Sequence, residues 1–146
     1  MRADSPTSDA TTARAAMRWV LAAFYAAAGI AHLYAPDKLL AITPSWVPFA
    51  PEIVFITGLC ELAGAAALVT KPLRRAAGFA LAAYAICVWP ANFKYALEGI
   101  DLPYISSSWL YHAPRLLLQP VLVWWALYSA EIIDWPWRRA NDRPQL

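Results

Sequence analysis

Charged residues are scarce in this sequence and make up 15% of its 146 residues, whereas a soluble domain carries about 25%. Its two cysteines are too few for the disulfide framework of a small secreted domain. A net charge of +2, spread along the chain, provides no basic patch for a nucleic acid. These shortages exclude a soluble enzyme, a disulfide-stapled secreted domain and a nucleic-acid-binding protein.

Motifs of catalysis and cofactor binding are also missing. The sequence has no HExxH pair, no Cys/His metal spacing, no glycine-rich phosphate loop and no G-x-S-x-G element. Neither a metal site nor a nucleotide-driven reaction is therefore predicted. Cys60 and Cys87 form no CxxC pair and are expected to be inert thiols in buried apolar surroundings. His32 and His112 lie near predicted helix ends and make a poor axial pair for haem.

Apolar residues, in contrast, make up 60% of the chain, and the mean hydropathy is +0.41. A soluble domain of this size cannot bury so much apolar surface, whereas a lipid bilayer solvates it. Four stretches are long enough to cross about 30 Å of hydrocarbon as helices: residues 16–33, 52–70, 75–97 and 110–133. The sequence therefore predicts an all-α fold, a four-helix transmembrane bundle. A cleaved signal peptide over the first stretch is less favoured, because the apolar run continues through Leu33.

Basic residues indicate the orientation, because they accumulate on the cytoplasmic side of a membrane. With four spans, both termini and the turn between the second and third spans share one side. That side holds nine of the twelve Lys and Arg residues: Arg2, Arg14, Arg18, Lys71, Arg74, Arg75, Arg138, Arg139 and Arg143. The N- and C-termini are therefore predicted to be cytoplasmic.

The predicted domain organisation is a membrane domain between two tails. Residues 1–13 lack apolar periodicity and are predicted to be a disordered cytoplasmic tail. Residues 14–135 form the four-span domain, and residues 136–146 form a second cytoplasmic tail.

The loop between the first two spans, Tyr34 to Pro51, is unusually apolar and contains several prolines. Asp37 to Ile42 is predicted to form a short interfacial helix. The remainder is interpreted either as a proline-stiffened lid on the bundle mouth or as a loop packed on its own helix ends.

Glu61 is the most informative residue, because an ionisable side chain is unfavourable in the hydrocarbon of a membrane. It follows Glu52 by nine positions, which places it roughly 13 Å deep at 1.5 Å per residue. An ionised side chain near the bilayer centre costs about 2.5–3.5 kcal/mol. Its helical neighbours are Thr57, Gly58, Gly64 and Ala65. Small residues at this spacing mark the face where helices approach closely, so Glu61 is predicted to point into the bundle.

Other polar side chains fall on comparable faces of the remaining spans: Tyr25 and His32 on the first, Asn92 on the third, Arg115 and Gln119 on the fourth. Arg115 and Asn92 are expected roughly 7 Å deep, and Gln119 about 13 Å deep, level with Glu61. These groups predict a polar cavity in the outer half of the bundle, and Arg115 is the expected counter-charge of Glu61.

Two further features are prolines within two of the predicted spans and a small number of polar residues in the predicted inner half. Pro90 and Pro120 are expected to kink their helices and to open space beside the polar groups. The inner half shows only Glu131 near its interface.

Each polar residue has a predicted role. Glu61 and His32 are the candidate catalytic residues, because they can handle protons. The candidate ligand-binding residues are Arg115, Asn92, Gln119 and Tyr25. The alternative interpretation is that the polar contacts only hold the helices together, each contributing about 0.6 kcal/mol.

Several short motifs follow one another along the chain: Gly29-x-x-His32, Pro36, Pro44-x-x-Val47-Pro48, Gly58-x-x-Glu61-x-x-Gly64, Arg74-Arg75 and Pro90-Ala91-Asn92. Their order over residues 16–133 resembles the DoxX-like family of small bacterial integral membrane proteins. The resemblance implies a four-helix bundle in the bacterial cytoplasmic (inner) membrane and a link to quinone or thiol redox chemistry. The missing cysteine pair argues against direct thiol chemistry.

The function expected from these observations is a redox- or quinone-linked accessory subunit, with a quinone as the cofactor considered. The alternatives are a non-enzymatic binding or transport module for a small amphipathic solute and a structural subunit of a membrane complex. The expected partners are the lipid bilayer and either a partner redox protein or a second copy of the chain. The sequence leaves open whether the chain is an enzyme.

Overall fold

The computed structural model describes residues 8–98 and 108–135. Over these residues the fold is all-helical and contains no strand. The helices are α1 (Ser8–Tyr34), α2 (Pro36–Ile42), α3 (Ala50–Val69), α4 (Arg74–Cys87), α5 (Trp89–Glu98) and α6 (Trp109–Ser129).

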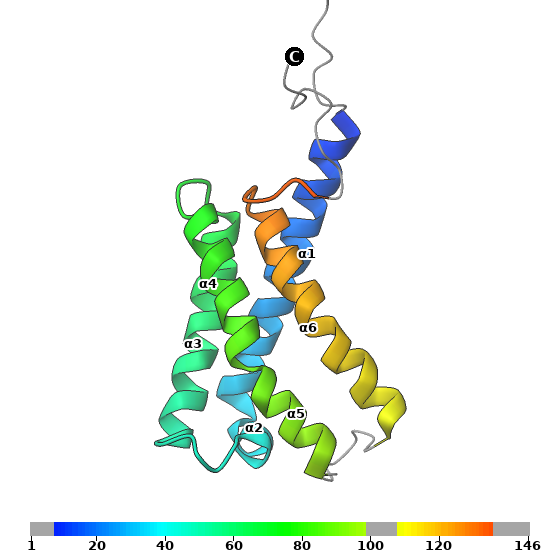
Figure 1. Ribbon diagram of the computed structural model, residues 1–146. Coiled ribbons are helices and arrows are strands. Elements are labelled where there is room, and N and C mark those ends of the chain that lie inside the picture. The colour runs from blue at the N-terminus through cyan, green and yellow to red at the C-terminus, as the bar shows by residue number, and fades with distance from the viewer. Residues whose placement is uncertain (1–7, 99–107, 136–146) are drawn as a thin grey trace, which may run out of the picture.

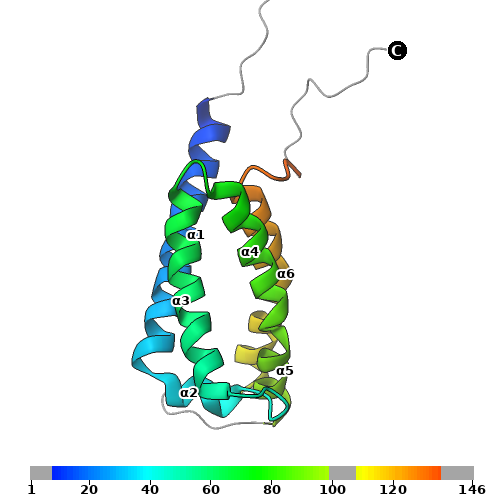
Figure 2. The ribbon, with the colours of Figure 1, turned by 90° about the vertical axis from the view of Figure 1, so that its left-hand side faces the viewer.

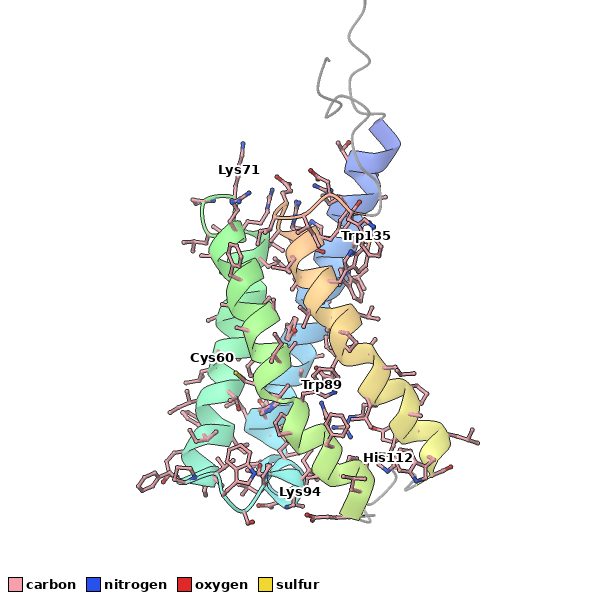
Figure 3. All side chains as sticks on the ribbon, in the orientation of Figure 1. Cys60, Lys71, Trp89, Lys94, His112 and Trp135 are labelled. Carbon is pink, nitrogen blue, oxygen red and sulfur yellow. The ribbon has the colours of Figure 1, made fainter. Side chains whose placement is uncertain are left out.

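The long helices run side by side, and α2 crosses one end of the molecule (Figures 1 and 2). The start of α1, the turn between α3 and α4 and the end of α6 lie together at the opposite end (Figure 1). Lys71 and Trp135 mark this opposite end, whereas Lys94 and His112 lie toward α2 (Figure 3). We call the two ends the basic end, which carries Arg14, Arg18, Arg74 and Arg75, and the α2 end.

Three segments are long and apolar enough to cross a membrane: Thr11–Tyr34, Ala50–Val69 and Arg74–Glu98. They support the membrane assignment made from composition. The fourth predicted stretch forms α6, but it is not among these three segments. Arg115, Gln119 and the two prolines inside α6 lower the hydropathy of this stretch.

The first helix begins earlier than predicted, at Ser8 rather than near residue 16. The predicted disordered tail is therefore helical from Ser8 onward, and residues 1–7 lie outside the described residues. Alanines are frequent in this segment and favour a helix. Arg14 also ties the first turns to the far end of the chain through a 2.7 Å ion pair with Asp134.

The third predicted span is divided into two helices at Val88. Pro90 has no N–H to donate to the carbonyl of Ile86, and its ring clashes with that carbonyl, which ends α4. Pro120 has a milder effect, because α6 continues through it as one helix. α6 then ends at Ser129 rather than near residue 133, and Glu131 adopts a left-handed backbone with φ 59°. The predicted tail 136–146 lies outside the described residues.

Small residues allow the long helices to approach closely. A Cβ added to Gly29 would lie 2.7 Å from the carbonyl oxygen of Gly58, so α1 and α3 nearly touch through their backbones. A Cβ added to Gly78 would overlap the Cβ of Ala130, at the contact between α4 and the end of α6. Close packing of this kind replaces the hydrophobic effect as the cohesive force between helices in lipid.

Candidate functional site

A cavity of about 370 Å³ lies between the helices toward the α2 end. All of the long helices contribute to its wall, together with α2 and the loop that follows it. The six residues that the sequence singled out all line it: Tyr25, His32, Glu61, Asn92, Arg115 and Gln119. Their convergence on one cavity is a structural finding, whereas their roles in binding or catalysis stay predictions.

Glu61 points into the bundle, as predicted, and is only 4% exposed. Its Oε2 lies 2.9 Å from Nδ1 of His32, on the neighbouring helix α1. The same Nδ1 is 2.9 Å from the carbonyl oxygen of Ala28. A carbonyl can only accept, so Nδ1 carries a hydrogen that is shared between two acceptors. This sharing explains why Glu61 Oε2 has a close polar neighbour but no aligned hydrogen bond among the described residues.

Tyr84 is a member of this site that the sequence analysis did not select. It lines the cavity from α4, and its hydroxyl interacts with the side chains of Glu61 and Thr57. The available signal was its position two turns before Asn92 along the same stretch. Tyr25 behaves differently, because its hydroxyl donates to the backbone carbonyl of Leu81 at 3.4 Å.

Arg115 is not the counter-charge of Glu61, which corrects the expected pairing. Its Nη2 donates to Oδ1 of Asn92 at 2.6 Å. Its guanidinium lies 4.8 Å from the centre of the Tyr95 ring, a cation–π contact. Among the residues that the structure describes, Arg115 forms no ion pair, and His32 takes the place beside the carboxylate. The cavity therefore has two separate polar centres, the Glu61–His32 pair and the Arg115–Asn92 pair.

Gln119 adds a further buried acceptor. The residue is 6% exposed, and its Oε1 has no hydrogen-bond partner within the described part of the chain. Glu61 Oε2 is less than fully satisfied, because the hydrogen of His32 Nδ1 is shared with Ala28. An unsatisfied buried acceptor costs about 1–3 kcal/mol, and more if it is charged. Both oxygens stand in the wall of the same cavity, where each can accept a hydrogen bond from a molecule in the cavity.

The loop after α2 covers part of the cavity. Thr43, Pro44, Trp46 and Val47 all line it, which agrees with the lid interpretation of this loop. Lys94 holds the segment in place from α5, because its Nζ donates to the carbonyl oxygens of Thr43 at 2.8 Å and Ala41 at 3.2 Å. These carbonyls stand at the C-terminal end of α2, where a cation also complements the helix dipole.

The basic end holds a polar cluster that the sequence analysis missed. Arg18 is only 8% exposed and reaches Glu131 at 2.7 Å, and Arg74 reaches the same carboxylate oxygen at 2.9 Å. Arg75 donates to the backbone carbonyl of Glu131 at 3.0 Å. The basic end, which the sequence analysis expected to be poor in polar groups, therefore holds several polar contacts. These arginines were interpreted as orientation signals only, and Arg18 in fact joins α1 to the end of α6.

Both cysteines are exposed, which corrects the expectation of buried thiols. Cys87 lines the cavity, whereas Cys60 does not. His112 is 1% exposed and does not line the cavity. Its ring packs edge-on against Tyr95 with the ring centres 4.7 Å apart. In the described ranges no group of three or more His, Cys, Asp or Glu side chains could hold a metal ion.

These features define a helical membrane protein with a polar site enclosed by its own helices. The chain belongs to a family described as Domain of unknown function (DUF8561), which matches residues 21–130. Neither a curated protein nor a solved structure matches the chain.

The family match corrects the resemblance to the DoxX-like family. The motifs behind that resemblance have local physical causes. Gly29, Gly58 and Gly64 stand where neighbouring helices approach closely, and Pro90 stands at a helix break. Such features recur in membrane helices of any family, so their order along the chain was a weak guide to ancestry.

Proposed function

We propose that this chain is a membrane-embedded binding protein that holds a small amphipathic molecule in the cavity. The observation that carries the proposal is a pair of buried acceptor oxygens in the wall of a 370 Å³ cavity. Gln119 Oε1 has no hydrogen-bond partner among the described residues, and Glu61 Oε2 has only the hydrogen of His32 Nδ1 that it shares with Ala28. Ligand pockets of this size combine an apolar lining with a few polar groups that fix orientation. The quinone-linked function drew on the resemblance that the family match overturns, so no redox partner is included.

Each polar centre has a proposed task. Glu61 accepts a hydrogen bond from the ligand, and His32 holds the carboxylate in position from 2.9 Å. Gln119 provides a second acceptor. Asn92 holds the Arg115 guanidinium, whose remaining N–H groups are available to an oxygen of the ligand.

The membrane arrangement is part of the proposal. α1, α3, the α4–α5 pair and α6 cross a bacterial inner membrane as a four-helix bundle with both termini in the cytoplasm. The four arginines of the basic end support this orientation.

Cysteine labelling tests the orientation. Lys71→Cys and Lys38→Cys are made in a Cys60→Ser, Cys87→Ser background, and intact cells with permeabilised outer membranes receive a membrane-impermeant maleimide. We expect labelling at position 38 and protection at position 71, because the two exposed lysines belong to opposite ends of the bundle. The reverse pattern would place the basic end outside.

Ligand binding is tested with 2-naphthol and with naphthalene, which lacks the hydroxyl donor. A hydrogen bond to a charged acceptor contributes about 1.5–3 kcal/mol, so Glu61→Leu should weaken 2-naphthol binding roughly 10- to 100-fold. Naphthalene binding should stay unchanged in the same variant, which shows that the cavity has kept its shape. Glu52→Leu removes an exposed carboxylate from the same helix and is the matched control.

Gln119→Leu supplies an independent second variant, with a smaller loss expected because its acceptor is neutral. Titration of purified protein in detergent by calorimetry measures both ligands. If 2-naphthol binds no more tightly than naphthalene, or if neither variant changes their ratio, the proposed function is wrong.

A further inference from the structure

One flank of the cavity reaches the surface of the molecule. Ile53 on α3 lines the cavity and is 41% exposed, and Cys87 at the end of α4 lines it and is also exposed. Trp46, from the loop after α2, lines the cavity and is 71% exposed. A side chain that belongs both to the cavity wall and to the surface stands at an opening, and we call these three residues the portal.

The helix break at Val88 accounts for this opening. α3 packs against α1, α2 and α4, whereas α5 packs against α2, α4 and α6 and makes no substantial contact with α3. Because of the break, α5 does not continue along the axis of α4. Figure 2 shows that α3 and α5 are separated next to α2. The cavity lies between their facing residues, such as Thr57 and Ala91.

Two of the three portal residues belong to segments that can cross a membrane. Ile53 lies in the segment Ala50–Val69, and Cys87 lies in Arg74–Glu98, both of which can cross a bilayer. Cys87 is eleven residues from the end of α5, which places it roughly 16 Å from that end. Exposed Ile56 and Ile86 continue the apolar surface beside the portal. The opening is thus surrounded by side chains that favour hydrocarbon over water.

The rim and the interior of the cavity differ in chemistry. The rim is apolar, so a solute with a permanent charge has no favourable path through it. The interior holds two acceptors, Glu61 Oε2 and Gln119 Oε1, together with the N–H donors of Arg115, so it suits a head group that both donates a hydrogen bond and carries an oxygen.

We infer that the cavity opens sideways into the membrane through the portal and takes its ligand from the lipid. The ligand class is a lipid-soluble molecule with a hydrogen-bond-donating head group, an alcohol or a phenol. The inference rests on the proposed binding function and adds the source and the chemical class of the ligand.

Native thiols provide the test, with the two cysteines as a matched pair. In a Cys60→Ser protein, N-cyclohexylmaleimide modifies Cys87, which is in the portal; in a Cys87→Ser protein, it modifies Cys60, which is exposed but outside the cavity. Modification follows folding, so it cannot prevent folding. Stopped-flow measurements in phosphatidylcholine vesicles then give the association and dissociation rates of 2-naphthol.

A group that blocks the portal slows both the entry and the release of the ligand. We expect the Cys87 adduct to slow association and dissociation by about tenfold or more while Kd changes much less. The Cys60 adduct should leave both rates unchanged. A charged probe, 2-naphthol-6-sulfonate, stays out of hydrocarbon and should not bind to the protein in vesicles.

The outcomes separate the inference from the function on which it rests. If 2-naphthol binds through Glu61 but the Cys87 adduct leaves its rates unchanged, the portal is wrong and the binding function stands. Slowing by an adduct at Leu118→Cys instead would move the opening to the flank where Phe24 and Leu118 are exposed, and would also overturn the inference. If the sulfonate binds as fast as 2-naphthol, the ligand comes from water. Loss of the Glu61 dependence would overturn both proposals.

Discussion

Substitution of Gly58 by alanine should separate α1 from α3 and disturb the Glu61–His32 pair. The added Cβ would lie 2.7 Å from the Cβ of His32 and 3.2 Å from the carbonyl oxygen of Gly29. Carbon atoms in ordinary contact are about 3.5–4.0 Å apart, so the helices must move apart by roughly 1 Å at this point. Neither neighbouring atom can rotate away, because a carbonyl oxygen and a Cβ are fixed by the backbone.

The magnitude follows from two opposing effects. Overpacking costs about 1–3 kcal/mol, and replacing glycine by alanine in a helix returns about 1 kcal/mol. We therefore expect Gly58→Ala to lower the free energy of unfolding by about 1 kcal/mol. Because His32 moves with α1, its contact with Glu61 lengthens, and 2-naphthol should bind more weakly than to the wild type.

Gly64→Ala is the matched control on the same helix. Its added Cβ would lie 2.6 Å from Cδ2 of Leu81, the far end of a flexible side chain that can change rotamer. Gly64→Ala should therefore keep the wild-type stability or exceed it slightly. Unfolding in mixed micelles with increasing dodecyl sulfate, followed by circular dichroism, measures both variants. Equal stability of the two variants, or unchanged 2-naphthol affinity in Gly58→Ala, would refute the reasoning.

Two further predictions concern the ends of the molecule. Lys94→Met removes both hydrogen bonds to the carbonyls of Ala41 and Thr43 and should speed protease cleavage after α2. Lys38→Met is the control and should leave the cleavage rate unchanged. Equal cleavage rates of the two variants would contradict the role of Lys94 in holding this segment. Glu131→Gln weakens the contacts to Arg18 and Arg74 and should lower the free energy of unfolding by about 1 kcal/mol, a modest loss because the carboxylate is half exposed. The micelle assay checks this value against Glu52→Gln, and no difference between the two variants would argue against a stabilising network.

The helix face that carries each polar residue could be predicted from the sequence, because all six candidates line the cavity, whereas the partner of each side chain could not. The depths placed Arg115 level with Asn92 and Gln119 level with Glu61, and the structure joins Arg115 to Asn92 at 2.6 Å. Pairing Arg115 with Glu61 instead followed charge alone and was wrong. His32, which does reach Glu61, was placed near the outer interface, because the close crossing of α1 and α3 is not visible in either segment alone.

Helix existence was predicted better than helix ends. The four apolar stretches and the short helix near residues 37–42 all correspond to helices, although Pro90 divides the third stretch. The early start of α1 combines a local cause, the frequent alanines, with a contact that the sequence does not reveal, between Arg14 and Asp134, which is 120 residues away in the chain. The start of α1 therefore depends on a long-range contact as well as on local propensity.

The basic end carries contacts that stabilise the fold, whereas the α2 end carries the cavity through which a ligand would enter. At the basic end, Arg18 and Arg74 converge on one carboxylate, so α1, α4 and the end of α6 are held together by contacts that a bound ligand does not need. Toward the α2 end, the cavity wall depends on a few contacts such as those of Lys94 with α2. Since α5 makes no substantial contact with α3, the wall between them can part without disturbing the basic end. A lateral opening is therefore compatible with a stable bundle, because the helices that must move are not the ones that hold it together.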